Sequence, residues 1–338
     1  MMKITSRLGL VGVVVLTLVV AMPVVAAESG KKISLGLSYQ AAPSASDPWH
    51  HMGLKWQSLL KEKTGGRIEL QLFGGGQLSG GNQQKEIELV QSGVIQVSIL
   101  PTVTLSVIDP RFLIVGLPWI VPTKAAADKL MDGPIAQETM TWLRAKQLEP
   151  IAVASNGFRQ LANRKHRVAK PEDLQGLKLR VPGSKMLVEA WKALGAQPVV
   201  VNFAELYTAL QQGTVDAEEL PWVYKFSTKF YEVEKYGTEL NYSFDLIYIL
   251  SNPALWRSFS PADQEILRST AQQAAKDERE FLEKSNQEVI GKLKANGMEI
   301  MILTPEQLAS FQAKMPPVYT QFAPTIGQEL IDRFRKGL

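Results

Sequence analysis

Residues 177–213, LKLRVPGSKMLVEAWKALGAQPVVVNFAELYTALQQG, alternate between two hydrophobic patterns. The short apolar runs 177–181 and 198–201 are typical of strands, whereas residues 185–194 have helical spacing and end at Gly195. A strand, a helix and a strand in this order predict an α/β unit with parallel strands, because the connecting helix must cross over the sheet.

A further helix is predicted at the end of this stretch. Asn202 and Glu205 have the spacing of a capping box, in which the Asn202 side chain accepts a backbone N–H and Glu205 reaches back. The helix is expected to end at Gly213, because glycine tolerates the left-handed conformation that closes many helices. A short helical turn is predicted upstream, at 171–174.

The N-terminal half of the chain repeats the same order and predicts a second α/β unit. An apolar strand at 150–155 begins the downstream unit, so a boundary is expected near residues 150–156. The upstream elements are expected to be strands 33–38, 67–72 and 94–100, with helices 49–63 and 81–92 between them.

The C-terminal part predicts one long helix. Ser260 and Pro261 form a strong helix start, and no breaker follows until Gly297. At 1.5 Å per residue such a helix is about 50 Å long, which exceeds the width of one α/β unit. We therefore expect it to lie across both units. Thr304 and the Pro316-Pro317 pair mark two shorter helices beyond it.

The N-terminus resembles an export signal. Lys3 and Arg7 precede an uncharged run, and small residues at 25–27 supply a cleavage site, so residues 1–27 are predicted to be removed. The alternative is a membrane anchor, because residues 8–27 are long enough to span a bilayer. Removal of the signal leaves 35 basic and 33 acidic residues, which indicates an exported, nearly neutral protein.

Composition and motifs argue against several classes of function. The chain has no cysteine, which excludes disulfides, zinc–thiolate sites, iron–sulfur clusters and cysteine nucleophiles. The small net charge disfavours nucleic acid as a partner. No nucleophile elbow, phosphate loop or zinc-protease motif is present, and the adjacent His50 and His51 diverge on a helix. We expect no catalytic centre, cofactor or metal.

Two arginines stand out by their positions. Arg180 lies opposite the apolar face of strand 177–181, near its end, and Arg159 follows the strand that ends at Ser155. Ligands of open α/β sheets bind beyond the carboxyl ends of strands, where two guanidinium groups would form a carboxylate clamp. The alternative is that Arg180 pairs with a structural Asp or Glu, and the spacing does not decide between these interpretations.

Several segments resemble the solute-binding proteins of tripartite ATP-independent periplasmic (TRAP) transporters of the DctP-like type. The likeness extends over residues 33–290 and is densest over 157–236. Each piece is weak alone, but their order is specific. The pieces are residues 63–67, residues 76–81, Gly157-Phe158-Arg159, residues 171–182, Leu194-Gly195-Ala196-Gln197-Pro198, residues 203–216 and residues 229–236.

The resemblance implies an α/β fold of the two-lobe periplasmic-binding-protein (Venus-flytrap) type, with the long helix spanning both lobes. The first lobe would comprise residues 28–153 with about 242–280, and the second 154–241 with about 281–338. It also implies a periplasmic receptor that captures a small carboxylate and delivers it to the small and large membrane subunits of a TRAP permease, with no nucleic acid involved.

The resemblance assigns roles to individual residues. Arg180 resembles the main carboxylate-binding arginine, Arg159 the second basic residue of the pocket, and Phe203 a ring that packs on the ligand. Leu220 stands where the family often has an amide, and Trp119 replaces a commoner Phe. These departures indicate a ligand less hydroxylated than a sugar acid, such as a keto acid or an acid with an apolar or aromatic tail. The full set of expected pocket residues is Arg180, Arg159, Phe203, Leu220, Glu219, Tyr39 and Trp119.

Two other functions remain open at this stage. A binding protein of an ATP-driven importer or a periplasmic sensor would share the fold, and neighbouring genes for two membrane subunits would favour the TRAP alternative. A periplasmic enzyme on the same scaffold would need a nucleophile–base pair or a metal. The chain has only three histidines, none with a plausible partner.

Overall fold

Two β-sheets organise residues 31–338, the part of the chain described by the computed structural model. The predicted signal segment 1–27 lies outside these residues. The first sheet has the order β2-β1-β3-β10-β4. Its strands are β1 (Ile33–Ser38), β2 (Ile68–Phe73), β3 (Val97–Pro101), β4 (Glu149–Phe158) and β10 (Phe244–Ser251).

The prediction of parallel strands is confirmed for the N-terminal part of this sheet. Strand β1 pairs in parallel with β2 and β3, and the helices α1 (Pro48–Thr64) and α2 (Gln83–Gln91) connect them. Strand β10 lies antiparallel between β3 and β4, so the complete sheet is mixed. A C-terminal strand is thus inserted between two strands from the N-terminal half.

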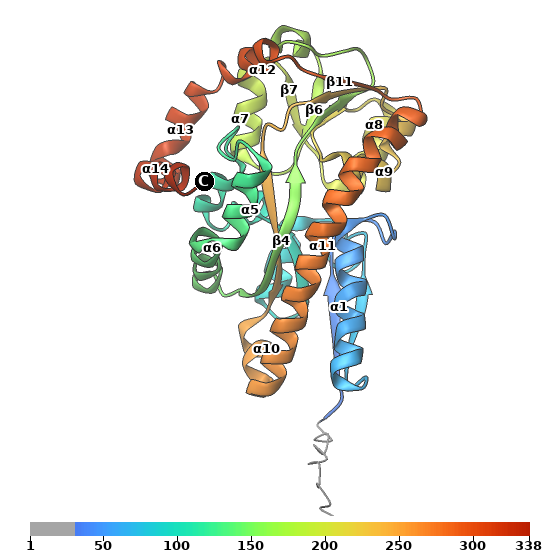
Figure 1. Cartoon of the computed structure of the whole chain (residues 1–338), viewed down its shortest axis with the longest axis vertical. Coiled ribbons are helices and arrows are strands. Elements are labelled where there is room, and N and C mark those ends of the chain that lie inside the picture. Colours follow the sequence, from blue (N-terminus) through green and yellow to red (C-terminus); the bar gives the residue numbers. More distant parts are fainter. Residues whose placement is uncertain (1–30) are drawn as a thin grey trace, which may run out of the picture. The chain divides into compact units, whose positions relative to one another are not determined.

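The second sheet has the order β11-β9-β5-β8-β6-β7. Figure 1 labels its strands β6, β7 and β11. Residues 177–213 form β6, α7, β7 and α8 close to the predicted positions. Strands β6 and β7 are parallel, as predicted. The elements are β5 (Leu161–Asn163), β6 (Lys178–Val181), α7 (Lys185–Ala193), β7 (Gln197–Val200), α8 (Leu206–Gln212), β8 (Ala217–Glu218), β9 (Tyr236–Glu239) and β11 (Glu299–Ile302).

The predicted capping box at Asn202 is wrong. Residues Phe203–Glu205 form a 3₁₀ turn, in which the backbone N–H of Glu205 donates to the carbonyl of Asn202 at 3.1 Å. This bond satisfies the N–H group that the Asn202 side chain was expected to cap. The Asn202 amide instead donates to the Glu205 carboxylate at 3.3 Å.

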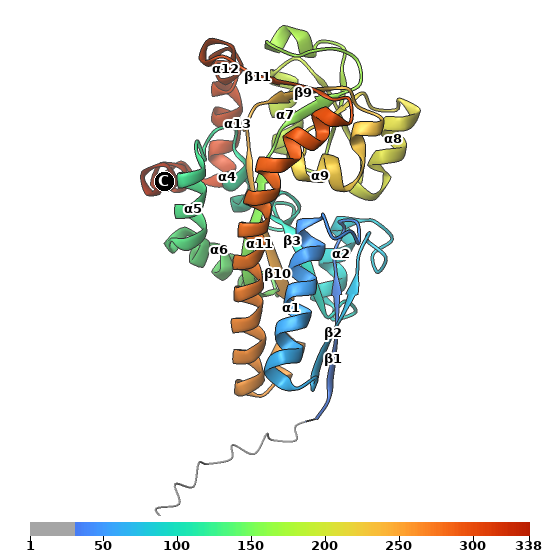
Figure 2. The same ribbon diagram turned by 45° about the vertical axis from the view of Figure 1, so that its right-hand side comes forward.

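The long helix α11 (Pro261–Ala295) contacts both sheets, as predicted. Its N-terminal half lies beside α1 and β4, with Leu267 and Ala274 buried in the core of the first sheet (Figures 1 and 2). Farther along, Val289 and Leu293 join a separate buried cluster with Trp222 and Met298, next to the second sheet. The helix is polar on its outer side. Within residues 31–338, no helix is long and apolar enough to cross a membrane.

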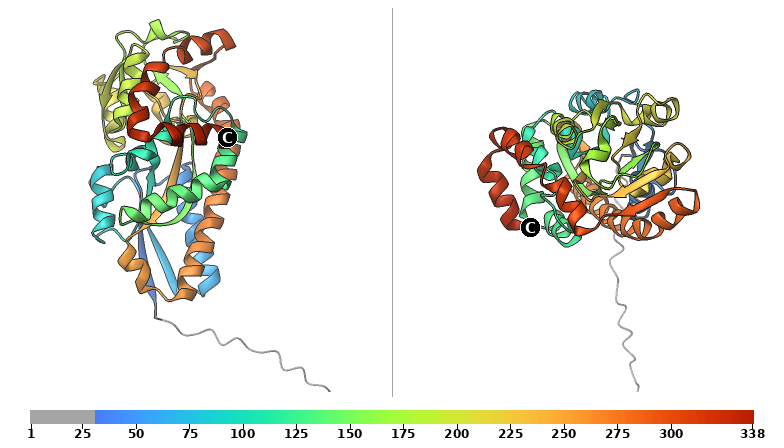
Figure 3. Two further views of the ribbon diagram at one scale, coloured as in Figure 1. Left: turned by 90° about the vertical axis from the view of Figure 1, so that its left-hand side faces the viewer. Right: turned by 90° about the horizontal axis from the view of Figure 1, so that it is seen from above.

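The C-terminal helices return to the side of α5 and α6 (Figure 3). Arg333 donates to Glu138 of α6 at 2.6 Å, and Phe334 is buried in the core that contains Leu143. The predicted lobe boundaries near 153 and 241 stay predictions. The remaining helices are α3 (Thr102–Leu105), α4 (Leu113–Gly116), α5 (Lys124–Asp132), α6 (Pro134–Ala145), α9 (Trp222–Ser227), α10 (Pro253–Ser258), α12 (Pro305–Gln312), α13 (Pro316–Ile326) and α14 (Gln328–Gly337).

Candidate functional site

A small cavity of about 40 Å³ lies between residues that follow strands of the two sheets. A larger groove of about 690 Å³ runs along α5 and α11, but neither predicted arginine lines it. We assign the site to the small cavity because it is concave, largely apolar and reached by two cationic side chains. It is lined by Gln40, Ala41, Trp49, Gln83, Pro101, Val103, Asn156, Arg159, Arg180, Pro182, Phe203, Leu220 and Tyr224.

Within residues 31–338, Arg180 is a buried cation without an ion-pair partner. It lies on β6 with only 1% of its surface exposed, and its Nε donates to the carbonyl of Val201 at 2.8 Å. Among residues 31–338 no carboxylate lies within ion-pair distance of it, and its two Nη atoms make no hydrogen bond. Burial lowers the pKa of the guanidinium to about 10, so it remains charged at neutral pH. The structural ion pair that was the alternative for Arg180 is absent from these residues.

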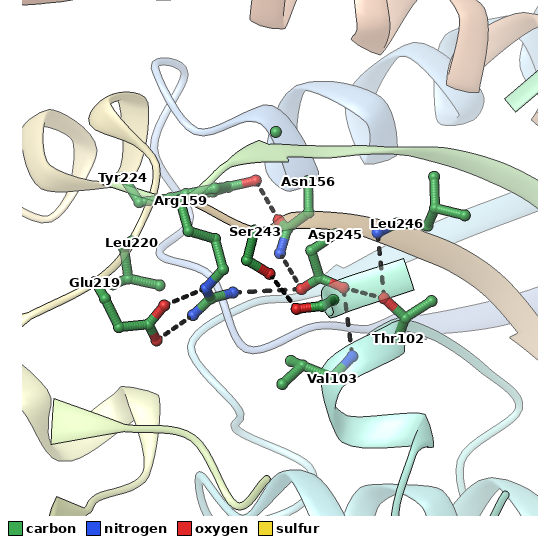
Figure 4. Close-up of polar contacts among 12 residues, drawn as sticks. Thr102, Val103, Asn156, Arg159, Glu219, Leu220, Tyr224, Ser243, Asp245 and Leu246 are labelled. Carbon is green, nitrogen blue, oxygen red and sulfur yellow. Dashed lines mark hydrogen bonds and ion pairs between the residues drawn. The ribbon is translucent and has the colours of Figure 1, made fainter. Parts of the chain in front are cut away.

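Arg159, in contrast, is held by two carboxylates (Figure 4). Its Nε and Nη2 both donate to Glu219, the latter at 2.6 Å, and its Nη1 lies 3.4 Å from Asp245. Burial is the largest single influence and lowers the pKa of Arg159, but the charge and the hydrogen bonds of Glu219, together with the charge of Asp245, outweigh it and hold the pKa above its usual value. Arg159 also lines the cavity, so one buried cation of the site is compensated and the other is not.

Glu219 does not line the cavity but holds Arg159, which does. Its carboxylate also accepts a hydrogen bond from the Tyr242 hydroxyl, which in turn accepts from Trp191 Nε1 at 3.1 Å. The neighbouring Glu218 points elsewhere, because it pairs with Lys225 and accepts the backbone N–H of Leu220 at 2.6 Å. The two adjacent carboxylates therefore point in different directions, and together they fix the segment that carries Leu220.

Asn156 joins three elements at the cavity. Its Oδ1 accepts from the Tyr224 hydroxyl at 2.7 Å, and its Nδ2 donates to Asp245 at 3.0 Å (Figure 4). The same Oδ1 also accepts from Trp49 Nε1 at 3.0 Å. Trp49 lies on α1, Tyr224 on α9 and Asn156 on β4. None of these three residues was predicted from the sequence. The one feature of the sequence that could have indicated Asn156 is the polar pair Ser155-Asn156, which follows the apolar residues 150–154.

The structure brings together some of the predicted site residues and not others. Arg180, Arg159, Phe203 and Leu220 line the cavity. Tyr39 is buried nearby, where its hydroxyl meets His50 Nδ1, and Glu219 lies behind Arg159. Trp119 packs against Tyr242, and its Nε1 donates to Leu240 at 3.2 Å. The cavity lining does not include Tyr39, Glu219 or Trp119. Their contact with a ligand stays a prediction.

Asp47 is a titratable group beside the site. It caps α1 by accepting the backbone N–H groups of Trp49 at 2.9 Å and His50 at 3.3 Å. Its second oxygen accepts from Ser227 of α9 at 3.2 Å, so it links the helix after β1 to a helix next to the second sheet. Burial raises the pKa of Asp47 to about 7.

We expect Asp47 to make the protein less stable as the pH rises from about 4 to about 7. The folded state holds this proton more tightly than the unfolded chain, so the stabilisation is complete below the unfolded pKa of 3.8 and is lost through the folded pKa of about 7. The loss amounts to at most about 4 kcal/mol. Asp47→Asn keeps the capping oxygen and removes the titration, which should flatten the pH dependence.

Urea unfolding at pH 4, 6 and 8 measures this effect. Asp128→Asn, at an exposed position on α5, is the control and should retain the wild-type dependence. An Asp47→Asn protein whose unfolding free energy follows pH as steeply as the wild type would contradict the assignment.

Two sheets, with a cavity lined by residues from both, define a two-lobed α/β architecture of the binding-protein type. Residues 38–325 match the family model DctP, bacterial extracellular solute-binding protein, family 7. The chain belongs to this family, and the resemblance to TRAP solute-binding proteins is confirmed.

Individual relatives are similar over most of their length. The 2,3-diketo-L-gulonate-binding periplasmic protein YiaO of Escherichia coli is 32% identical over 268 residues, which cover 79% of this chain and 80% of YiaO. The C4-dicarboxylate-binding periplasmic protein DctP of Rhodobacter capsulatus is 29% identical over 331 residues, 96% of this chain and 95% of that protein. A TRAP periplasmic solute-binding protein from Ralstonia eutropha, solved with (S)-2-acetolactate, has a TM-score of 0.86 and 31% identity, and the match covers 90% of this chain and 98% of that one.

Proposed function

We propose that this chain is the periplasmic receptor of a TRAP transporter, which captures a small carboxylate and passes it to the small and large permease subunits. One observation carries the proposal. Arg180 is buried in the cavity without an anionic partner among the described residues, next to a second arginine whose charge is already compensated. The similar proteins from E. coli, R. capsulatus and R. eutropha are named for, or were solved with, organic acids.

The unpaired cation provides a reason for closure to depend on the ligand. Burying a charge without a counter-ion is costly, so closing the empty site around Arg180 is unfavourable. A carboxylate that enters supplies the missing charge and offers two oxygens to the free Nη atoms. Because the ligand interacts better with the closed form, it shifts the population of the receptor toward that form.

The other cavity residues favour a small and partly apolar acid. Leu220, Phe203 and Val103 offer no hydrogen bond from their side chains, and the free space of about 40 Å³ is small. Glu219 and Asp245 hold the Arg159 side chain in place before a ligand binds. Contact between Arg159 and a ligand would therefore require little rearrangement of that side chain. This lining agrees with the expectation that the ligand carries fewer hydroxyl groups than a sugar acid.

Calorimetric titration and thermal unfolding with a panel of small acids test the proposal. The panel contains 2-oxo acids, 2-hydroxy acids, C4-dicarboxylates and sugar acids, each paired with its uncharged amide. An acid present at 100 times its dissociation constant should raise the unfolding free energy by about 2.7 kcal/mol, and its amide should have no such effect. Amides that bind as tightly as their acids would contradict a carboxylate receptor.

We also propose that residues 1–27 are removed on export, so that the mature chain begins near Glu28. The family relatives named above are periplasmic proteins, which supports this proposal. Intact-mass measurement of the protein from the periplasmic fraction should give the mass of residues 28–338. Recovery from the membrane fraction of a chain that retains Met1–Ala27 would contradict it.

A further inference from the structure

Most of the polar side chains that line the cavity are already bonded within the protein. The Nε2 of Gln40 donates to Ser79 at 2.8 Å and to Glu86, and its Oε1 is inaccessible. Asn156 bonds to three side chains, two of which also line the cavity, and Arg159 is held by two carboxylates. A ligand therefore finds little free hydrogen-bonding capacity in these groups.

Gln83 is the exception among the polar lining residues. It is the first residue of α2 and half-buried, and its side chain makes no hydrogen bond within residues 31–338. The preceding Asn82 caps the helix by accepting from the backbone of Lys85 at 3.0 Å, so the Gln83 amide is not needed there. Neither end of that amide is buried, so its donors and its acceptor are accessible to a ligand.

The residues on either side of Gln83 approach segments that belong to the second sheet. A Cβ atom on Gly81 would lie only 2.9 Å from the Cβ of Ala204. On the other side, the Nε2 of Gln84 lies 3.0 Å from the place that a Cβ of Gly183 would take. Both of these facing segments also line the cavity, through Phe203 and Pro182. The start of α2 is therefore held against the segments that carry the opposite part of the lining.

The charges around the cavity favour a single anionic group on the ligand. Arg180 is the one cation of the lining without an ion-pair partner in residues 31–338. Among the described residues, no lysine or arginine of α1, α2 or β3 lines the cavity. The buried charged groups near Gln83 are instead carboxyl groups, those of Glu86 on α2 and Asp245 on β10. A second carboxylate of the ligand beside Gln83 would be buried without a counter-ion, which is costly.

We propose that Gln83 is a specificity-determining residue that binds an uncharged polar group of the ligand, so that the receptor selects acids with one carboxylate over dicarboxylates. This inference rests on the proposed carboxylate function and narrows it. Arg180 takes the carboxylate, and the Gln83 amide exchanges a hydrogen bond with a hydroxyl, keto or amide group at the other end of the molecule. An amide offers both donors and an acceptor, so it pairs with any of these groups, but it cannot neutralise a second negative charge.

Acids of nearly equal shape test this selectivity by calorimetric titration at about pH 7.5, where all their carboxyl groups are ionised. Succinamate carries a neutral amide where succinate carries its second carboxylate, and 4-methylpentanoate carries two methyl groups there. The set that is one carbon longer is glutaramate, glutarate and 5-methylhexanoate. For the wild type, the amide acid of at least one set should bind about 3- to 10-fold more tightly than its apolar partner, the range of one hydrogen bond. It should bind about 10-fold or more tightly than the diacid.

Two variants of Gln83 change the site in opposite ways. Gln83→Leu removes the amide at similar size, so the amide acid should lose its advantage while the apolar acid binds as it does to the wild type. Gln83→Arg adds a cation at the same place, so the diacid should now bind more tightly than the amide acid. Gln84→Leu, at the next and exposed position outside the lining, is the matched control and should keep the wild-type order of the three acids. Melting curves without ligand show that each variant is folded.

The outcomes separate this inference from the function on which it rests. Tightest binding of the diacids by the wild type, or wild-type preferences in a folded Gln83→Leu protein, would overturn the role of Gln83 alone. The same holds if neither set binds while other acids of the first panel do. If no acid of either panel binds, the carboxylate function itself is overturned.

Discussion

Replacing Arg180 with alanine is expected to weaken carboxylate binding by about 30- to 5,000-fold without lowering the stability of the unliganded protein. Loss of one partner of a buried, hydrogen-bonded charge pair costs roughly 2–5 kcal/mol, which corresponds to this range of affinity. Arg180 has no carboxylate partner among the described residues, so its removal leaves no buried anion behind. The empty protein should be as stable as the wild type or slightly more stable, because a costly buried charge is gone.

Two variants sharpen this prediction. Arg180→Lys keeps the charge but loses the planar pair of donors, so it should also bind weakly. Lys178→Ala, at an exposed position on the same strand, is the matched control and should bind like the wild type. Calorimetric titration gives the affinities, and melting curves without ligand give the stabilities. A folded Arg180→Ala protein with wild-type affinity would refute the role of Arg180.

Replacing Arg159 should have the opposite pattern, with its main effect on folding. Arg159→Met leaves the Glu219 carboxylate buried without its counter-ion and removes a contact from Asp245. Breaking a buried pair on one side costs roughly 3–5 kcal/mol. We therefore expect a large fall in the unfolding free energy of the empty protein, together with weaker ligand binding.

A double variant separates the charge effect from lost packing. Arg159→Met with Glu219→Leu removes both partners of the pair and should recover part of the stability, because no unpaired carboxylate remains at position 219. Urea unfolding of the wild type, both single variants and the double variant gives the coupling. A double variant that is destabilised by the full sum of the two single changes would show that the pair does not act as a unit.

The sequence predicted most of the architecture because the patterns that define it are local. Alternating and helical spacing placed β1, α7 and α11 within a few residues, since burial of one face imposes these periods on the chain. The capping box failed for a local reason as well. The first turn at Asn202 is 3₁₀, and a backbone bond replaces the side-chain cap.

The site was only partly predictable, because its partners are distant in sequence. Arg180 could be placed at a strand end, but the identity of its neighbours depends on how the sheets meet. Arg159 and Glu219 are 60 positions apart in the sequence. The residues next to an arginine in the sequence do not show whether it pairs with a carboxylate of the protein or stays unpaired until a ligand binds. Gln40 and Asn156 were missed because an amide becomes distinctive only when its hydrogen bonds are known.

The insertion of β10 between β3 and β4 has a consequence for the order in which the chain can fold. Residues 244–251 form the strand that joins β3 to β4, so the first sheet stays divided until this late segment is available. Pairings over such long sequence separations form slowly, because the loop between the partners must close first. A nascent chain that emerges N-terminus first therefore lacks a finished core until most of its length has appeared, and its first lobe matures only with the rest of the molecule.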